Sequence, residues 1–211
     1  MSKITLAAAS IILSVALVMP FNMFAQSNHI SSLPIGSEIP GSVKNVAMQS
    51  TNGELVTLSK AVTSEGLLVM FSCNTCPYVI KSQPRTHEMI KYAKKKGIGM
   101  VILNSNETQR HDVDGIDAMK KYAMEQNYTV PYLVDRNSLV ADAFGASHTP
   151  EVFLFDKNGK LIYKGAMEDN PSNPENSKKM YLKDAMDAMM LGKAPNPNST
   201  RSIGCGIKRQ S

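Results

Sequence analysis

Runs of apolar residues predict buried strands in the first half of the chain. Residues 66–71 and 98–103 are continuous apolar runs of strand length, a pattern typical of strands covered on both faces of a sheet. Between them, residues 76–96 carry apolar positions at helical spacing, and Gly97 is a natural helix stop. The pattern therefore predicts a strand–helix–strand unit.

Further along the chain, the same criteria predict alternating helices and strands. The predicted elements are helices over 116–126, 139–144 and 178–191 and strands over 130–134, 152–155 and 161–163. Ahead of them, Val43–Met48 and Leu55–Leu58 flank the turn dipeptide Asn52-Gly53, which predicts an N-terminal β-hairpin extension. This order is typical of an α/β fold with a central mixed β-sheet flanked by helices.

The first residues have the pattern of a secretory signal peptide. Lys3 precedes an apolar run over 4–19, and the small residue Ala25 stands before a polar stretch. Cleavage near Ala25 would export the protein, most naturally to the periplasm, where disulfides persist. The alternative is an uncleaved membrane anchor, because the run approaches the ~20 residues of a spanning helix. Pro20 and Asn22 weigh against that reading.

The length of 211 residues favours one folded domain. We predict a signal peptide over 1–25, an extended segment over 26–41, the folded domain over 42–192 and a C-terminal tail over 193–211. The net charge is a modest +5. The densest run of basic residues, Lys94–Lys96, suits a helix C-terminus. No aromatic residues interleave with this run, so no nucleic-acid partner is predicted.

Three cysteines carry the candidate chemistry, and an odd number in an exported protein indicates a reactive thiol or a changing pairing. A thiolate is the attacking species, and the start of a helix favours it. We expect Cys73 at or just before a first helical turn and Cys76 one turn later. Cys76 would then close a disulfide after Cys73 has formed a mixed disulfide with a substrate.

Two other uses of this pair are a permanent structural disulfide and half of a zinc site. Zinc would need two further ligands at metal spacing. The remaining candidates are scattered singly along the chain: Cys205, His29, His87, His111 and His148. Neither a metal nor a cofactor is therefore predicted.

Thr149-Pro150 stands directly before the strand predicted over 152–155. An X–Pro bond in such a place is a candidate cis peptide. The Thr149 backbone could face the cysteines and hold an extended substrate peptide by strand-like hydrogen bonds. Thr149 and Pro150 are thus candidate substrate-binding residues.

Several motifs together resemble the thioredoxin-like redoxin family, in the branch of alkyl hydroperoxide reductase and thiol-specific antioxidant proteins. The resemblance covers roughly residues 35–208. It rests on FSCNTCPYV at 71–79, Asn104–Asn106, PYLVD at 131–135, TPEVFLFD at 149–156 and IGCGIK at 203–208. It implies a thioredoxin-like fold, a redox-active pair at Cys73 and Cys76, and Asn74, Thr75 and Pro77 as residues flanking the pair.

This chain departs from thioredoxins in two ways. Thioredoxins carry Trp-Cys-Gly-Pro-Cys, whereas this sequence has Asn74-Thr75 between its cysteines and no tryptophan. The buried acid that thioredoxins place in the preceding strand is also absent, because residues 67–71 are all apolar. Water, His148 or Glu151 would then have to move the proton of Cys76.

The resemblance leaves three functions open. Disulfide exchange with proteins, supported by an external redox partner, is favoured. Peroxiredoxins instead use Thr-x-x-Cys-Pro with a nearby arginine, where this chain has Cys73 and Thr149. A thiol peroxidase would use Cys76 on peroxide, with Cys73 or Cys205 as the resolving cysteine. A copper-binding protein is the third reading, since thiolates suit Cu(I), although the copper-binding family has one more residue between its cysteines.

Overall fold

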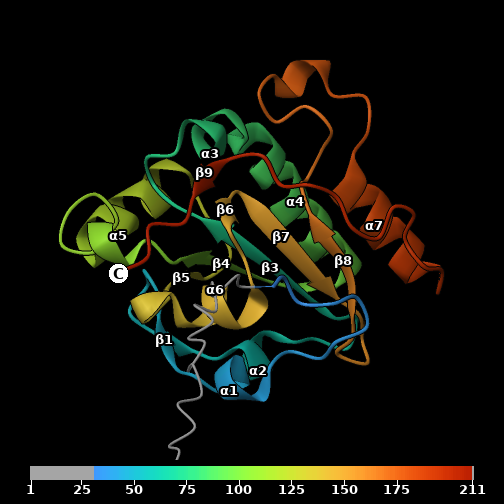
Figure 1. Ribbon diagram of the computed structural model, residues 1–211, viewed down its shortest axis with the longest axis horizontal. Coiled ribbons are helices and arrows are strands. Elements are labelled where there is room, and N and C mark those ends of the chain that lie inside the picture. The colour runs from blue at the N-terminus through green and yellow to red at the C-terminus, as the bar shows by residue number, and fades with distance from the viewer. Residues whose placement is uncertain (1–30, 211) are drawn as a thin grey trace, which may run out of the picture.

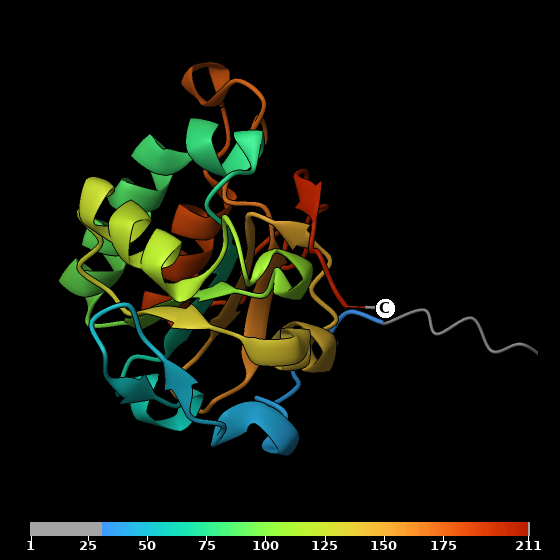
Figure 2. The same cartoon turned by 90° about the vertical axis from the view of Figure 1, so that its left-hand side faces the viewer.

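The computed structural model describes residues 31–210, which form a five-stranded mixed sheet with helices on both faces (Figures 1 and 2). The order of strands across the sheet is β5-β4-β3-β7-β8. Their bounds are β3 (Leu67–Ser72), β4 (Gly99–Asn104), β5 (Tyr132–Val134), β7 (Glu151–Phe155) and β8 (Leu161–Gly165). The predicted α/β fold with a mixed sheet is confirmed.

Strands β3, β4 and β5 are parallel, whereas β7 pairs antiparallel with both β3 and β8. Parallel neighbours need crossover connections, which helices supply here. The carboxyl ends of β3 and β4 consequently lie at the same edge of the sheet, with Ser72 opposite Asn104. The cysteine motif begins at that edge.

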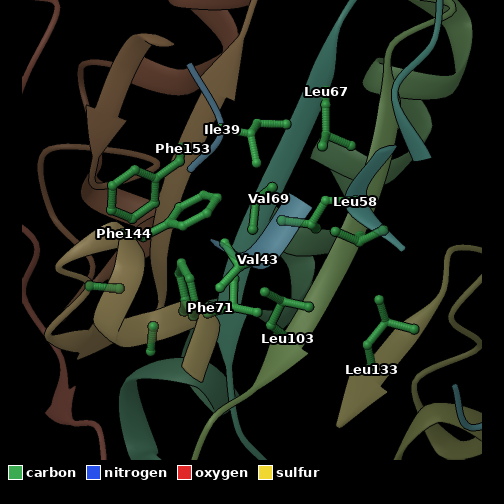
Figure 3. Packing of buried hydrophobic residues seen from close by; sticks show 14 of the residues in the cluster. Ile39, Val43, Leu58, Leu67, Val69, Phe71, Leu103, Leu133, Phe144 and Phe153 are labelled. Atoms are coloured by element: carbon green, nitrogen blue, oxygen red, sulfur yellow. The ribbon is translucent and has the colours of Figure 1, made fainter. Parts of the chain in front are cut away.

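Alternation along β3 divides the core into two halves. Leu67, Val69 and Phe71 face the side covered by α1, α2 and α6 (Figure 3), and Leu68 and Met70 face the side covered by α4, α5 and α7. Both halves are closely covered, which is why the strand reads as a continuous apolar run. The helices are α1 (Gly41–Lys44), α2 (Leu58–Ala61), α3 (Pro77–Lys81), α4 (Gln83–Lys96), α5 (Ile116–Glu125), α6 (Leu139–Phe144) and α7 (Tyr181–Met190).

The N-terminal hairpin is shorter than predicted. Strands β1 (Met48–Gln49) and β2 (Leu55–Val56) pair antiparallel around the expected turn. The beginning of the predicted first strand is instead helix α1, which follows Pro40. Leu58 begins α2 rather than ending a strand, because the Thr57 side chain accepts a hydrogen bond from the Lys60 N–H and caps that helix.

The single helix predicted over 76–96 is two helices that meet at Ser82. Helix α4 restarts with Pro84 in its first turn, where the missing N–H of proline costs no helical hydrogen bond. Its end at Gly97 is as predicted, with a left-handed backbone at φ 74°.

The segment predicted as a C-terminal tail returns to the domain. Residues 198–202 run beside β8, and β9 (Cys205–Gly206) pairs antiparallel with β6 (His148–Thr149). The predicted signal peptide over 1–25 lies outside the described residues. Within residues 31–210, none of the helices has the length and apolar character needed to cross a membrane.

Replacing Phe144 by alanine tests the half of the core that contains Phe71, on the strand leading into the cysteine motif. Its ring lies edge-on to three others, at centroid distances of 5.7 Å from Phe71, 5.2 Å from Phe153 and 5.7 Å from Phe155. We expect Phe144→Ala to lower the free energy of unfolding by ~3–5 kcal/mol in urea titrations. Leu55→Ala, at a site 65% exposed, is the control and should change it by less than ~0.5 kcal/mol. Equal losses for both variants would contradict this packing.

Candidate redox site

The cysteine motif follows β3 directly, at the carboxyl end of the sheet. Cys73 lies in the connecting loop, and Cys76 is the N-cap residue of α3, with Pro77 in the first turn of that helix. The expectation that Cys73 lies at or just before the first helical turn, with Cys76 one turn later, is therefore wrong, because Cys76 itself is the N-cap. Since α3 starts at Pro77, Cys76 is the cysteine at its N-terminus.

Cys76 forms a disulfide with Cys205, and Cys73 is a free thiol. Cys73 and Cys76 are both buried, whereas Cys205 is partly exposed. The structure brings all three predicted sulfur atoms into one cluster with Val79. It places the bond between Cys76 and Cys205, where the sequence favoured a bond within the CxxC pair.

Thr149 contacts both cysteines of the motif. Its Oγ1 lies 3.4 Å from the Sγ of Cys73, and its carbonyl oxygen lies 3.3 Å from the Sγ of Cys76. The Thr149–Pro150 peptide is cis. Of the two residues predicted to bind substrate, Thr149 thus lies against both sulfur atoms, and Pro150 follows it through the cis bond.

The edge formed by β6 is occupied by the chain's own strand β9 (Figure 1). Thr149 lies opposite Cys205, and His148 lies opposite Gly206. Gly204 approaches so closely that a Cβ on it would overlap the Thr149 carbonyl oxygen. Glycine is therefore required there by the proximity of the two backbones, since its φ is not positive.

A buried acid missed from the sequence lies beside the motif. Asp114 is fully buried, and its Oδ1 accepts hydrogen bonds from the Asn74 N–H at 2.9 Å and from Asn104 Nδ2 at 2.7 Å. Its Oδ2 accepts from Asn106 Nδ2 at 2.8 Å. The available signal was its position in the loop after β4, because that loop starts at the same sheet edge as the cysteines.

Burial is the main influence on Cys73 and raises the pKa of its thiol. The Thr149 hydroxyl and the backbone N–H groups of Cys76 and Thr75 lower that pKa, whereas the negative charge of Asp114 raises it further. Cys73 is therefore held as a thiol in this form of the protein. The expected activation of Cys73 by a helix start is not what the structure shows.

The two residues suggested by the sequence as carriers of the Cys76 proton form hydrogen bonds near the start of β6 instead. Glu151 is buried, and its Oε2 accepts hydrogen bonds from the N–H groups of Ser147 and His148. His148 Nδ1 bonds to the hydroxyl of Ser147. Both residues shape the turn into β6. Within residues 31–210, no three His, Cys, Asp or Glu side chains form a group suited to a metal ion.

Comparisons with known proteins agree with this geometry. The family model described as Redoxin matches residues 34–181. The thiol-disulfide oxidoreductase ResA of Bacillus cereus is 24% identical over 132 residues, which are 63% of this chain and 69% of that protein.

Solved structures agree as well. An uncharacterized conserved protein from Geobacillus kaustophilus superposes with a TM-score of 0.75 at 31% identity, covering 84% of this chain and 93% of its own. A thioredoxin-like protein in the oxidized form shares the fold, with a TM-score of 0.59 at 22% identity over 76% of this chain and 99% of its own. The predicted thioredoxin-like fold is confirmed.

Replacing Asp114 by asparagine tests the influence of its charge on Cys73. In a protein that also carries Cys76→Ser and Cys205→Ser, Cys73 is the remaining cysteine of the three. We expect Asp114→Asn to lower the pKa of Cys73, because a nearby negative charge disfavours the thiolate. Thiolate ultraviolet absorbance against pH measures the shift. Asp117→Asn, whose side chain is 91% exposed, is the control and should leave the titration unchanged; an unshifted curve for Asp114→Asn would refute the assigned influence.

Proposed function

Because this chain belongs to the redoxin family, we propose that it is an exported thiol–disulfide oxidoreductase that exchanges disulfides with protein substrates through Cys73 and Cys76. The predicted family and the predicted class of enzyme, a thiol–disulfide oxidoreductase, are confirmed by its relatives. One observation carries the finer proposal. Cys205 lies on a strand paired with Thr149 and is bonded to Cys76, which is the arrangement of a mixed disulfide.

The substrate binds, in this proposal, as an extended strand on β6. Strand addition uses main-chain hydrogen bonds and so accepts many sequences, while a cysteine opposite Thr149 supplies the reactive sulfur. The substrate sulfur then reaches Cys76, whose Sγ lies against the Thr149 carbonyl oxygen. Substrates are accordingly proteins with an accessible disulfide or thiol in an extended segment.

The exchange proceeds in two steps. The Cys76 thiolate, at the N-terminus of α3, attacks a substrate disulfide, and one substrate sulfur leaves as a thiolate. Cys73 then loses its proton and attacks the Sγ of Cys76. The second substrate thiolate leaves, so the substrate gains two electrons and the enzyme keeps a Cys73–Cys76 disulfide. An external dithiol partner restores the pair, and the same steps in reverse oxidise a substrate dithiol.

Export is supported by the pattern of residues 1–25 and by the chemistry of the site. A short positive start, an apolar run and Ala25 are typical of a cleaved signal peptide. An oxidising compartment such as the periplasm supplies both disulfide substrates and the need for a dedicated redox partner. If the apolar run were kept, the same site would work from a membrane anchor.

A thiol peroxidase is the second candidate, and the Cys76–Cys205 bond is what favours it. Cys76 would reduce peroxide to water and become a sulfenic acid, and the Cys205 thiol would condense with it, releasing a second water. Against this, a peroxiredoxin-like arginine is replaced by Thr149 at the site.

Serine replacements distinguish the roles of the two motif cysteines. With insulin as substrate and a dithiol as reductant, we expect wild type to accelerate disulfide reduction and both Cys73→Ser and Cys76→Ser to fall to the uncatalysed rate. In a background that also carries Cys205→Ser, Cys73→Ser should accumulate a covalent complex with the substrate, because both sulfur atoms that could release it from Cys76 are missing. Cys76→Ser in the same background is the matched control and should accumulate none.

The opposite trapping pattern would assign the attack to Cys73. Hydrogen peroxide consumption, measured on the same variants, separates the second candidate. A rate of peroxide consumption that depends on Cys76 and exceeds the rate of insulin reduction would favour the peroxidase.

A further inference from the structure

We propose that Cys205 is a third working cysteine of this site and that residues 203–209, the covering segment, occupy the substrate edge until Cys73 displaces Cys205 from Cys76. This inference rests on the proposed function, because the covered edge is the one assigned to the substrate. It adds a step in which the chain's own strand competes with the substrate.

The covering segment is held on its upstream side by strand β8. The Lys164 N–H donates to the Asn198 carbonyl oxygen at 3.2 Å, and the Thr200 N–H donates to the Lys164 carbonyl oxygen at 3.0 Å. The hydroxyls of Tyr163 and Thr200 lie 2.7 Å apart. These contacts precede residue 203, so the covering segment can leave β6 while its base stays attached.

Downstream contacts hold the covering segment through backbone hydrogen bonds and through the side chain of Arg209. The Ile207 N–H donates to the Ser147 carbonyl oxygen at 3.0 Å, and the Lys208 N–H donates to Asn106 Oδ1 at 2.9 Å. Arg209 pairs with Asp142 at 2.6 Å, with both side chains partly exposed. Partly exposed pairs of this kind are worth ~0–1 kcal/mol, so the Arg209–Asp142 pair adds little to the hold that the backbone hydrogen bonds and the buried Ile207 side chain supply.

The two glycines that flank Cys205 differ in the space available for a side chain. A Cβ on Gly204 would overlap the Thr149 carbonyl oxygen, whereas a Cβ on Gly206 would meet nothing within 4 Å. Gly204 is therefore required for docking against β6. Gly206 is its matched counterpart on the other side of Cys205.

Displacement needs no outside oxidant. The Cys73 thiolate attacks the Sγ of Cys76, a Cys73–Cys76 bond forms, and the Cys76–Cys205 bond breaks with its electron pair on Cys205. Cys205 takes up the proton that Cys73 gave. One disulfide and one thiol are present before and after. Both motif sulfur atoms contact Thr149, which keeps attacker and target side by side.

The covered and uncovered forms thus differ in which cysteine is free and in whether the covering segment lies on β6. In the covered form Cys73 is buried and protonated, so its attack is slow. In the uncovered form the β6 edge is open, and the Cys73–Cys76 disulfide is ready for a dithiol.

Disulfide mapping of the oxidised full chain tests the proposal in wild type, Gly204→Ala, Gly206→Ala and Cys73→Ser. Free thiols are alkylated, and the peptides are identified by mass spectrometry. We expect wild type to yield Cys76–Cys205, Gly204→Ala to shift several-fold toward Cys73–Cys76 with Cys205 alkylated, and Gly206→Ala to match wild type. Cys73→Ser should keep Cys205 protected throughout, because nothing displaces it.

Equal distributions in Gly204→Ala and Gly206→Ala would overturn the docking, and alkylated Cys205 in oxidised Cys73→Ser would overturn the displacement. The rate at which the reduced enzyme forms a mixed disulfide with insulin through Cys76 should rise several-fold in Gly204→Ala, and an unchanged rate would overturn the covering role. Absence of insulin reduction by wild type would instead defeat the proposed function, while the mapping would still decide whether Cys205 exchanges.

Discussion

The buried carboxylate of Asp114 binds together three segments that would otherwise be independent: the cysteine loop, the end of β4 and the loop after it. Its two oxygens accept hydrogen bonds from Asn74, Asn104 and Asn106. A buried charge without such donors would cost several kcal/mol, and each charged hydrogen bond returns ~1.5–3 kcal/mol. The carboxylate therefore fixes the backbone between the two cysteines at Asn74, and its charge acts at the same time on Cys73.

The same hydrogen-bonded network reaches the C-terminal segment. Asn106 donates to Asp114 through Nδ2 and accepts from the Lys208 N–H through Oδ1, so one side chain joins the cysteine loop to the covering segment. Covalent linkage through Cys76 and Cys205, strand pairing on β6 and this amide bridge all act on the same few residues. A change of disulfide partner is for that reason also a change in what covers the sheet edge, because exposed strand edges invite another strand to pair.

The parts of this arrangement that the sequence predicted are those set by local patterns. Continuous apolar runs located β3 and β4, and the position of the cysteines after β3 placed the site at the carboxyl end of the sheet. The sequence offered the Cys76–Cys205 bond only as the alternative in which Cys205 resolves Cys76, because a pairing across 129 residues depends on tertiary approach. Asp114 escaped notice for a related reason: in a polar loop, nothing local distinguishes a solvated carboxylate from one that the fold buries. The break at Ser82 was missed for a different reason: the helical spacing of apolar residues continues across both helices, so it did not reveal where one ends and the next begins.

Thr149 contacts the cysteines of the site and is also part of the strand pairing that holds the C-terminal segment. Its hydroxyl lies against Cys73, its carbonyl oxygen lies against Cys76, and its backbone pairs with the strand that carries Cys205. Three sulfur atoms are thus arranged around one residue. The carbonyl oxygen also sets a steric limit, because a strand in the register of β9 has no room for a side chain immediately before its cysteine. In the proposed exchange, selection of what docks on this edge therefore comes from the Thr149 backbone, while the choice of bond comes from the relative ionisation of the three sulfur atoms.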